Sequence, residues 1–343
     1  MYPGIQGMQA WVAGINAAGG IDCHPLKYVV SDDGSDPARH QSLVKQLVEQ
    51  QKAISVVYID SPLASQASAD YLAQKRVPAI GSSEGDIPMY DTPMHFPQIP
   101  AGPGAIDMYI VLGAKATVPK GLTKVASIMC QEVTFCTNAE KRVADLAPSL
   151  GWKLVSQGKA SLSQPDFTAQ CLAAQRAGAQ AVVIAFESSG ARRLAASCAK
   201  VNYKAPIIMS SNMVTADMGQ DPNMEGAIVG TSALPWFLDS APAVKELNGA
   251  LQKYAPGVKS GPGVLIGWTA GKLFEKAARG HVSDSPSSAD VLNGLWSIKS
   301  DNLGGLTYNL SFTQDQKAPR VICGWISTIT GGKFTSDGNA VCQ

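Results

Sequence analysis

Three serines carry side chains suited to holding an anion. Ser61 follows the apolar run 54–59, and Ser82 and Ser83 follow the apolar run 77–80. Small hydroxyl groups beside free helix amides can hold a carboxylate by charge-assisted hydrogen bonds without adding a full charge. A serine at a helix start also serves as an N-cap, and neighbouring residues can divide the two roles. We therefore expect these serines to contact a small ligand, with helix capping as the alternative.

Further candidate ligand contacts follow other apolar runs. Aromatic side chains form the walls of many ligand clefts, and the aromatic candidates are Tyr2, Phe135, Phe186 and Trp236. Burial in a core is the alternative for Phe135 and Phe186. The polar candidates are Glu84, Glu187 and Asn212. If buried, Glu187 would pair with a ligand ammonium; if solvated, it is a helix-start acid favoured by the helix dipole.

Catalytic and metal-binding signals are weak. The phosphate-binding patterns Gly-x-Gly-x-x-Gly and Gly-x-x-x-x-Gly-Lys-[Ser/Thr] are absent. The histidines are scattered over loops and helix starts, at His24, His40, His95 and His281. No Cys-x-x-Cys occurs, and only Cys23 has a histidine beside it. We expect no enzyme activity, no metal and no cofactor.

Composition narrows the classes of partner. The 343 residues can form two lobes of ordinary size. Charges nearly cancel, with 28 Lys and Arg against 27 Asp and Glu and no basic stripe, which argues against a nucleic-acid surface. No uninterrupted apolar run reaches the roughly 18–20 residues that span a bilayer, so we expect no direct membrane insertion.

Seven cysteines are many for a cytosolic protein and plausible for an exported one. Cys130 and Cys136 flank a short loop, and two others lie on successive predicted helices. A third pair brackets the C-terminal strand region. The expected disulfides are Cys130–Cys136, Cys171–Cys198 and Cys323–Cys342. Cys23 is left unpaired, or pairs with a cysteine in a segment ahead of this sequence.

Residues 14–37 contain a helix end, a strand and a new helix start. Asn16 and the pair Gly19-Gly20 supply the left-handed backbone that ends a helix. The apolar residues of 26–30 predict a short buried strand, followed by a turn at 32–34. Asp36-Pro37 caps and starts the next helix, because Pro needs no amide partner at the first helical position.

The same unit recurs along the chain, which predicts an α/β fold with two doubly wound parallel-sheet lobes. A proline-rich irregular segment, 86–104, ends in a crossover between the lobes. The predicted strands after the first are 54–59, 77–80, 124–129, 152–155, 181–185, 206–209, 226–230, 304–308 and 321–329, with a hairpin-like close at 331–334. The helices expected to pack back on the first lobe are 240–254, 261–279 and 287–298.

Two motifs carry a family resemblance. Asn16-Ala-Ala-Gly-Gly-Ile21, an apolar stretch and Asp32-Asp33-Gly34-Ser35-Asp36-Pro37 resemble the start of type I periplasmic solute-binding proteins of ABC transporters, in the branched-chain amino-acid-binding family. The ending, with Gly304-x-Leu-x-Tyr-Asn309 and Gly332-Lys-Phe334, is similar as well. The resemblance covers nearly the whole chain.

The resemblance implies both a domain organisation and a function. It implies an N-terminal lobe of 1–98 plus 233–315 and a C-terminal lobe of 99–232 plus 316–343, joined by a three-segment hinge that closes over a small molecule. It further implies a monomer that delivers its ligand to ABC transporter permease subunits. The expected location is periplasmic or extracellular, with the signal peptide removed. A cell-surface lipoprotein, held by a lipid anchor on the N-terminus that is removed here, is included in this expectation.

The chain also departs from this family's pattern. Relatives begin with a central strand that is missing here, and we expect the natural protein to have it because a sheet without it leaves a core gap. Relatives that bind amino acids carry an acid in the second lobe, whereas Ser210, Ser211 and Asn212 follow the strand 206–209. This departure argues against an α-amino acid and leaves room for a neutral or purely carboxylate solute, so the candidate ligands are an amino acid, a small aromatic or aliphatic acid, and an amide. A ligand-sensing domain of a receptor or regulator, and an α/β enzyme, are the alternative functions.

Overall fold

The computed structural model describes residues 3–85, 92–100 and 103–343. Its contacts divide the chain into two units. Unit 1 is Met1–Gly102 with Leu238–Arg320, and unit 2 is Pro103–Phe237 with Val321–Gln343. The chain therefore passes three times from one unit to the other. Each observed boundary lies four or five residues after the boundary expected from the sequence.

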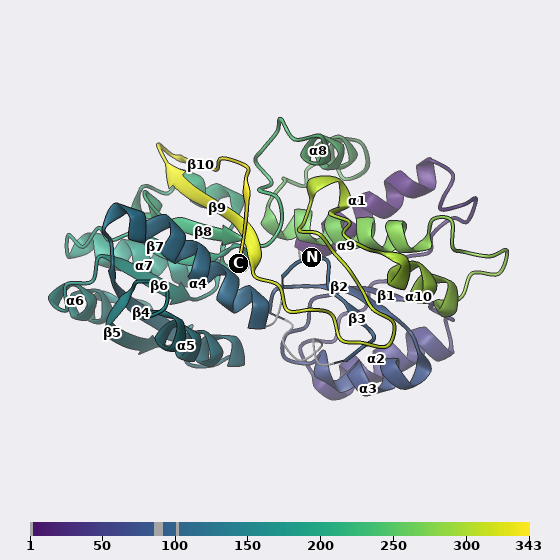
Figure 1. Ribbon diagram of the computed structural model, residues 1–343, viewed down its shortest axis with the longest axis horizontal. Coiled ribbons are helices and arrows are strands. Elements are labelled where there is room, and N and C mark those ends of the chain that lie inside the picture. The colour runs from purple at the N-terminus through teal and green to yellow at the C-terminus, as the bar shows by residue number, and fades with distance from the viewer. Residues whose placement is uncertain (1–2, 86–91, 101–102) are drawn as a thin grey trace. The chain divides into compact units, whose positions relative to one another are not determined.

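Unit 1 contains a three-stranded parallel sheet in the order β1-β2-β3 (Figure 1). Its strands are β1 (Val56–Ile59), β2 (Ala79–Ser82) and β3 (His95–Phe96). Its helices are α1 (Pro3–Ala17), α2 (Pro37–Glu49), α3 (Gln66–Lys75), α8 (Pro242–Tyr254), α9 (Pro262–Ala278) and α10 (Ser288–Ser297). Val44 on α2 and Leu72 on α3 are buried in one apolar cluster with Ile59 of β1.

Helices α1 and α9 pack closely because glycines line their contact. A Cβ added at Gly267 would lie 1.9 Å from the carbonyl oxygen of Gly4. A Cβ at Gly7 would lie 2.0 Å from the carbonyl oxygen of Val264. Real side chains cannot approach backbone so closely, so these positions need glycine for the observed helix separation.

The predicted strand 26–30 is wrong, although the elements on either side of it are as expected. Gly19 and Gly20 have φ angles of 98° and 88° after the end of α1. Asp36 caps α2, its side chain accepting a hydrogen bond from the Arg39 amide at 2.7 Å. Residues 27–31 make no hydrogen bond to any other residue that the structure describes. A strand needs a paired neighbour, and this apolar stretch has none.

Unit 2 contains one large sheet, in the order β10-β9-β8-β7-β6-β4-β5, with β11 also paired to β9. Strands β4 to β8 are parallel, whereas β9 runs antiparallel to β8 (Figure 1). The strands are β4 (Lys124–Cys130), β5 (Lys153–Ala160), β6 (Ala181–Ala185), β7 (Ile207–Ser210), β8 (Ile228–Thr231), β9 (Cys323–Thr330), β10 (Lys333–Thr335) and β11 (Ala340–Cys342). The helices are α4 (Pro103–Thr117), α5 (Thr134–Leu146), α6 (Thr168–Arg176) and α7 (Ser188–Lys200).

Helix α4 was not predicted, because it lacks an amphipathic pattern. Nearly all of its residues are buried, including Ile106, Tyr109 and Leu112. It packs against β7, β8 and β9, so several of its sides meet apolar neighbours. A helix that is apolar all round gives no 3.6-residue periodicity from which to recognise it.

The C-terminal region contains a second correction. Residues 304–308 form no strand; Leu303–Gly305 is a 3₁₀ turn in which Gly304 and Gly305 have φ angles of 72° and 92°. The close at 331–334 is a hairpin, since β10 pairs antiparallel with β9 after the turn at Gly331 and Gly332. Strand β11 was not predicted.

All three expected disulfides are present, and each lies within unit 2. They are Cys130–Cys136, Cys171–Cys198 and Cys323–Cys342. Cys23 is exposed and has no disulfide partner among the described residues.

Candidate functional site

The serines predicted to bind a ligand follow neighbouring strands of unit 1. Strands β1 and β2 are parallel, with Ile59 opposite Ser82, so their carboxyl ends lie side by side. The Ser83 amide donates to the Ile59 carbonyl at 2.9 Å. Ligands of open α/β sheets bind beyond such strand ends. The structure thus brings Ser61, Ser82 and Ser83 to one edge of the sheet.

Ser82 and Ser83 differ in access. Ser82 is fully buried, and its backbone amide donates to Gln98 Oε1 at 3.1 Å. Gln98 Nε2 donates in return to the Ser82 carbonyl at 3.0 Å. Ser83 is half-buried, whereas Glu84, the next residue, is fully buried. Ser83 is therefore the member of the pair that a ligand can reach, and Gln98, which the sequence did not single out, holds the strand end in place.

A polar cluster that the sequence did not predict lies beside these serines. The carboxylate oxygen Asp33 Oδ2 lies 2.7 Å from His40 Nδ1 and accepts a hydrogen bond from Ser61 Oγ at 2.5 Å. The other ring nitrogen, His40 Nε2, lies 2.9 Å from Ser68 Oγ. Asp33 also belongs to the predicted turn at 32–34, where its Oδ1 accepts a hydrogen bond from the Ser35 amide at 2.7 Å. The signal in the sequence that could have indicated this contact is the seven-residue spacing from Asp33 to His40, with the start of α2 between them.

These hydrogen bonds shift the pKa of Asp33. Burial alone would raise it, but the hydrogen bonds from Ser61 and His40, together with the Ser35 amide, hold the pKa of Asp33 below its ordinary value. The Asp33 side chain is therefore a carboxylate at neutral pH, and it binds three donors from the turn, from α2 and from the end of β1.

The order Asp33–His40–Ser68 has the connectivity of a catalytic triad but not its accessibility. Ser68 is fully buried on α3, and its hydroxyl donates to the Ser65 carbonyl at 3.1 Å. A nucleophile must reach a substrate carbonyl, so this serine cannot play that part. The cluster is a hydrogen-bonded support for the strand ends.

The run Gly81-Ser82-Ser83-Glu84-Gly85 also matches the letters Gly-x-Ser-x-Gly of a nucleophile elbow. An elbow places its serine on a strained turn between a strand and a helix. Here Gly81 has a φ of 73°, Ser83 is not in the left-handed region, and residues 84–85 form a turn. The sequence therefore matches the pattern, but the backbone does not form a nucleophile elbow.

Asp60 adds a second carboxyl to this edge of the sheet. Burial raises the pKa of Asp60 above its ordinary value, and the negative charge of Asp33 raises it further. A hydrogen bond with the Ser83 side chain acts in the opposite direction. The Ser83 hydroxyl is thus hydrogen-bonded to a carboxyl group, which orients it at this edge of the sheet.

Unit 2 has its own group of candidates at the end of β4. The Cys130–Cys136 disulfide closes the loop that carries Phe135. The Phe135 ring is half-buried and stacks on Tyr109 of α4, with ring centroids 6.5 Å apart. Glu132 in the same loop accepts hydrogen bonds from Ser161 Oγ at 2.6 Å and from the Leu162 amide. Phe135 therefore lies in the first turn of α5, within the span of chain that the disulfide closes.

The candidates that follow β6 and β7 differ in how deeply they are buried. Phe186 is buried and packs edge-on against Phe167, with centroids 5.2 Å apart, so its alternative role in the core applies. Glu187 is exposed at the start of α7, where it lies 3.3 Å from Arg193 and accepts from Ser189. This matches the reading of Glu187 as a helix-start acid. Asn212 is exposed after β7.

Two aromatic candidates remain. Trp236 is buried, and its ring packs against Phe237 and Phe334 with centroids 5.1 and 4.9 Å apart. Its ring therefore belongs to an aromatic cluster of unit 2. Tyr2 lies outside the described residues.

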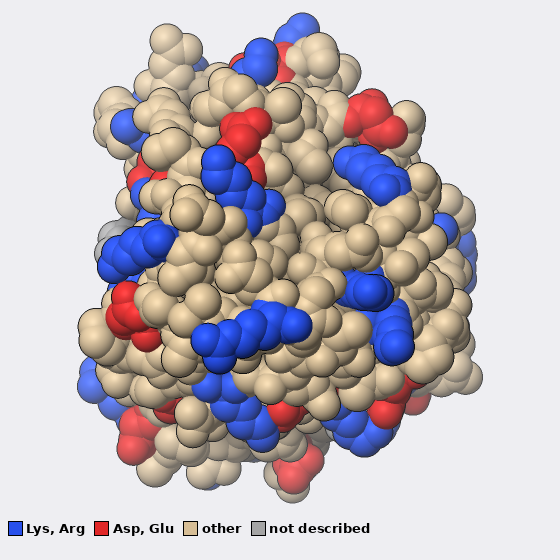
Figure 2. Space-filling view, turned by 90° about the vertical axis from the view of Figure 1, so that its left-hand side faces the viewer, with Lys and Arg blue, Asp and Glu red and all other residues tan. Residues whose placement is uncertain are grey.

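Charges of both signs are mixed on the face of the molecule that Figure 2 shows. Figure 2 shows one face of the molecule, on which Lys and Arg are interspersed with Asp and Glu among broad uncharged areas. Within the described part of the chain, no three His, Cys, Asp or Glu residues are grouped so that they could hold a metal ion. No helix in that part is both long and apolar enough to cross a membrane.

Comparison with known proteins identifies the family. The sequence profile of the periplasmic binding proteins matches residues 2–332. The chain belongs to the periplasmic binding protein family. It is therefore a member of a solute-binding, non-enzymatic family. No curated protein matches the sequence.

Solved structures share the fold of this periplasmic binding protein at low sequence identity. A branched-chain amino acid ABC transporter protein from Thermus thermophilus with bound valine is 16% identical, with a TM-score of 0.85 over 99% of this chain and 92% of that one. A fatty acid ABC transporter substrate-binding protein from Thermomonospora curvata is 18% identical, with a TM-score of 0.80 over 99% and 88%. A solute-binding protein from R. palustris in complex with benzoate is 16% identical, with a TM-score of 0.75 over 99% and 92%.

Proposed function

We propose that this protein captures a small organic acid or amide outside the cytoplasm and delivers it to an ABC importer. The named ligands of the structural neighbours, valine, fatty acid and benzoate, all come from proteins of ABC transporters. Valine, fatty acids and benzoate all carry a carboxylate, so this group is the feature that a shared mode of binding would recognise.

The observation that carries the proposal is the position of Ser83. Its side chain is half-buried at the carboxyl end of β2, beside the end of β1, and hydrogen-bonded to Asp60. A hydroxyl held by a carboxyl group, at the edge where α/β sheets bind ligands, can change partners when an acid or amide arrives. We propose Ser83 as the polar contact of unit 1; Ser61 is buried and its hydroxyl donates to Asp33, so its part is to support this edge of the sheet.

The charges of unit 2 favour an acid or amide over an α-amino acid. An amino-acid ligand needs a carboxylate for its ammonium group. The acids near the exits of β4 and β6 are engaged, Glu132 with Ser161 and Glu187 with Arg193. Phe135, in the first turn of α5 and within the span closed by the disulfide, offers an aromatic surface, and Asn212 offers an amide. We propose these two as the contacts of unit 2.

Export is supported by the cysteines. Three disulfides in one unit are expected of a protein that folds in an oxidising compartment. We propose a periplasmic or cell-surface location and, as partners, the permease subunits of the importer.

A thermal-shift screen tests the proposal. A ligand that binds only the folded state stabilises it by RT ln(1 + [L]/Kd), so the melting temperature rises with the logarithm of the ligand concentration once that concentration exceeds Kd. The panel contains benzoate, an aliphatic acid of eight carbons, their amides, and valine and leucine. We expect a rise with an acid or amide and a smaller rise, or none, with the amino acids. A rise confined to valine or leucine would contradict the ligand class, and turnover of any bound compound would contradict the function.

A further inference from the structure

The hydroxyl of Ser83 lies beside the carboxyl group of Asp60 at the edge of the sheet of unit 1. Ile59 of β1 and Ser82 of β2 are opposite each other, so the residues that follow them leave the two strands side by side. The Ser83 amide donates to the Ile59 carbonyl at 2.9 Å, which fixes this pairing. The side chains of Asp60 and Ser83 are hydrogen-bonded to each other, and both residues are half-buried. A donor and an acceptor are therefore neighbours where we propose that the ligand binds.

This edge carries acids, and the chain supplies no cation next to them. The negative charge of Asp33 acts on Asp60. Residues 53–74, which include Asp60, and residues 77–114, which include Ser83, contain no lysine or arginine. A ligand carboxylate at Ser83 would add a further negative charge beside Asp60 without a cation from either segment. Neighbouring like charges disfavour each other's ionised form, so a carboxylate is a poor match for this edge.

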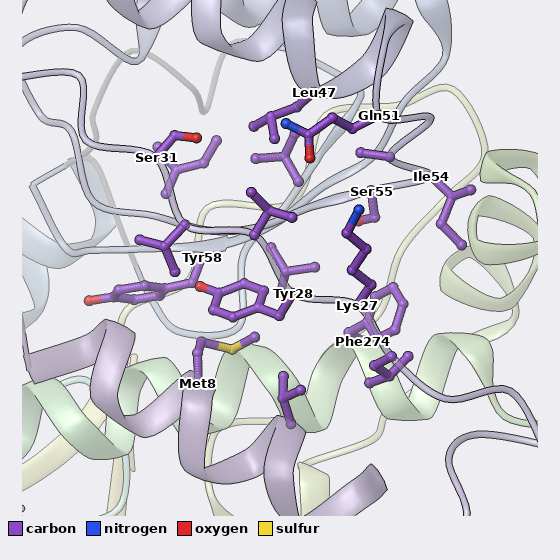
Figure 3. A pocket seen from close by; sticks show the side chains of 18 of the residues that line it. Met8, Lys27, Tyr28, Ser31, Leu47, Gln51, Ile54, Ser55, Tyr58 and Phe274 are labelled. Atoms are coloured by element: carbon purple, nitrogen blue, oxygen red, sulfur yellow. The ribbon is translucent and has the colours of Figure 1, made fainter.

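Apolar side chains near Asp60 make this repulsion stronger. Asp60 and Tyr58 line a cavity of about 620 Å³ in unit 1. Figure 3 shows Tyr58 in that cavity, together with Met8, Leu47 and Phe274. Charges interact more strongly beside apolar groups than in water, because the effective dielectric constant is lower. A negatively charged head group is therefore disfavoured here unless a proton is bound with it.

A primary carboxamide matches both protein groups without adding a charge. Its carbonyl oxygen can accept from the Ser83 hydroxyl, and its N–H can donate to the Asp60 carboxylate. On binding, the Ser83 proton would turn from Asp60 to the ligand and a ligand proton would take its place, so neither protein group loses a hydrogen bond. An ammonium group supplies donors but no acceptor for the Ser83 hydroxyl, and a carboxylate supplies acceptors but no donor for Asp60.

We propose that the site at Ser83 takes a carboxamide, and that Asp60 is the residue that selects it over a carboxylate. This inference rests on the proposed function, whose ligand class of acid or amide it narrows to the amide. A carboxylic acid can use the same two groups only when the acid and Asp60 share one proton, because a neutral acid also has one donor and one acceptor. An acid should therefore bind better as the pH falls, whereas an amide needs no proton.

The experiment compares each amide with its own acid in the native protein. The pairs are benzamide with benzoate and octanamide with octanoate, and benzylamine and octylamine are the cationic counterparts. Titration calorimetry gives the Kd of each compound at pH 7. For the carbon skeleton that binds, we expect the amide to bind roughly ten- to a hundredfold more tightly than the acid, the factor typical of a hydrogen bond to a charged group.

The same titrations at pH 5 provide a second measurement. If an acid binds with one shared proton, its Kd should fall by up to about tenfold per pH unit, whereas the Kd of the amide should change little. The other described titratable groups near this edge include Asp33, His40, Tyr58, Glu84 and His95. These groups face both ligands, so the ratio of the two Kd values isolates the shared proton.

The variant Asp60→Asn tests the selecting residue. Its side-chain amide can donate to a carboxylate and the negative charge is gone, so the acid should gain affinity and the amide should lose it. We expect the preference for the amide to fall at least about tenfold. The control Asp70→Asn removes an exposed carboxylate on α3 and should leave the preference unchanged. A purely structural role of Asp60 would change both affinities together and leave their ratio as it is.

The possible results separate this inference from the proposed function. Tighter binding of an acid than of its amide by the native protein at pH 7 would overturn the inference and leave the proposed function standing. A preference that Asp60→Asn does not change would show that Asp60 does not select the head group. Tightest binding of an amine would overturn the inference in favour of a cationic ligand. Binding of none of these compounds, nor of any other in the thermal-shift panel, would overturn both the inference and the ligand class of the proposed function.

Discussion

His40 Nδ1 and Asp33 Oδ2 lie 2.7 Å apart and join the first turns of α2 to the loop before it. The same carboxylate oxygen accepts the hydroxyl of Ser61 from the end of β1. One oxygen atom therefore connects a loop, a helix and a strand beside the proposed ligand contacts. The ionised state of Asp33 becomes a condition for that arrangement.

We expect Asp33→Asn to reduce both the stability and its dependence on acid pH. Because the pKa of Asp33 is lower in the folded state, its contribution is present above the unfolded pKa of about 4 and is lost as the pH falls below it. The variant should lose about 1–3 kcal/mol in the free energy of unfolding at pH 7, and this deficit should shrink by pH 3. Urea unfolding at pH 7, 5 and 3 measures both. The exposed carboxylate Asp70 on α3 provides the control Asp70→Asn, and an equal deficit in that control would contradict the role of Asp33.

Asp60→Asn should have the opposite sign. The folded protein raises the pKa of Asp60, so keeping this group ionised costs stability at neutral pH. That cost is absent below the unfolded pKa of about 4 and grows as the pH rises through the folded pKa. The variant should therefore unfold at a higher urea concentration than the native protein at pH 7, and at a similar concentration at pH 3. A variant that is less stable at pH 7 would show that ionised Asp60 is favoured by its surroundings.

Ser83→Ala should weaken binding of the ligand found in the thermal-shift screen. A buried ligand oxygen that loses its hydrogen-bond donor costs roughly 1–3 kcal/mol, which corresponds to about a 5- to 150-fold increase in Kd. Titration calorimetry measures this directly. The matched control is Ser55→Ala, which removes the hydroxyl that donates to the Pro78 carbonyl just ahead of β1, away from the carboxyl end. If calorimetry finds the same Kd for Ser83→Ala and the native protein, Ser83 is not in the site.

Gly267→Ala should strongly destabilise unit 1. The new methyl group would lie 1.9 Å from the Gly4 carbonyl oxygen, so α1 and α9 would have to separate. Overpacking of this kind costs about 1–3 kcal/mol or more. Gly249→Ala on α8 is the control, because nothing lies within 4 Å of its added Cβ. There the change should stabilise by about 0.5–1 kcal/mol through helix propensity, so chemical unfolding should move in opposite directions for the two variants.

Removing one or the other of two disulfides of unit 2 should affect stability and ligand affinity to different degrees. In the chain-entropy description, the 27-residue span of Cys171–Cys198 contributes roughly 3–4 kcal/mol, and the 6-residue span of Cys130–Cys136 roughly 2 kcal/mol. Replacing both cysteines of the longer span by Ser should therefore lower the melting temperature more. Replacing Cys130 and Cys136 should have the larger effect on ligand affinity, because Phe135 lies in their loop. Equal affinity in the two double variants would argue against Phe135 as a contact.

Much of the fold could be predicted from local signals. The strand 181–185 is an uninterrupted apolar run bounded by turns and was predicted to the residue. The start of α2 was predictable because Asp36 and Pro37 carry both a cap and a proline at the first helical position. The cysteine pairs followed from their positions on neighbouring predicted elements, and all three are confirmed.

The sequence-based predictions are wrong where contacts with distant parts of the chain determine the local structure. Residues 26–30 have the composition of a strand but no partner beside them, so composition alone misleads. Helix α4 is buried on several sides and shows no amphipathic period. In the candidate site, strand ends were predictable from the alternation of elements. The bond from Asp33 to His40, and the burial that places Phe186 in the core, depend on side-chain packing, which no local pattern of the sequence contains.

Each unit is built from two separate segments of the chain, and this determines when during translation the units can fold. Strand β9 lies inside the sheet of unit 2, next to β8, yet it is translated only after the whole of the 238–320 segment that completes unit 1. Neither unit can therefore reach its final contacts until the ribosome has passed residue 320. On the export route that we propose, this delay keeps the nascent chain in the unfolded form that a secretion machinery can thread.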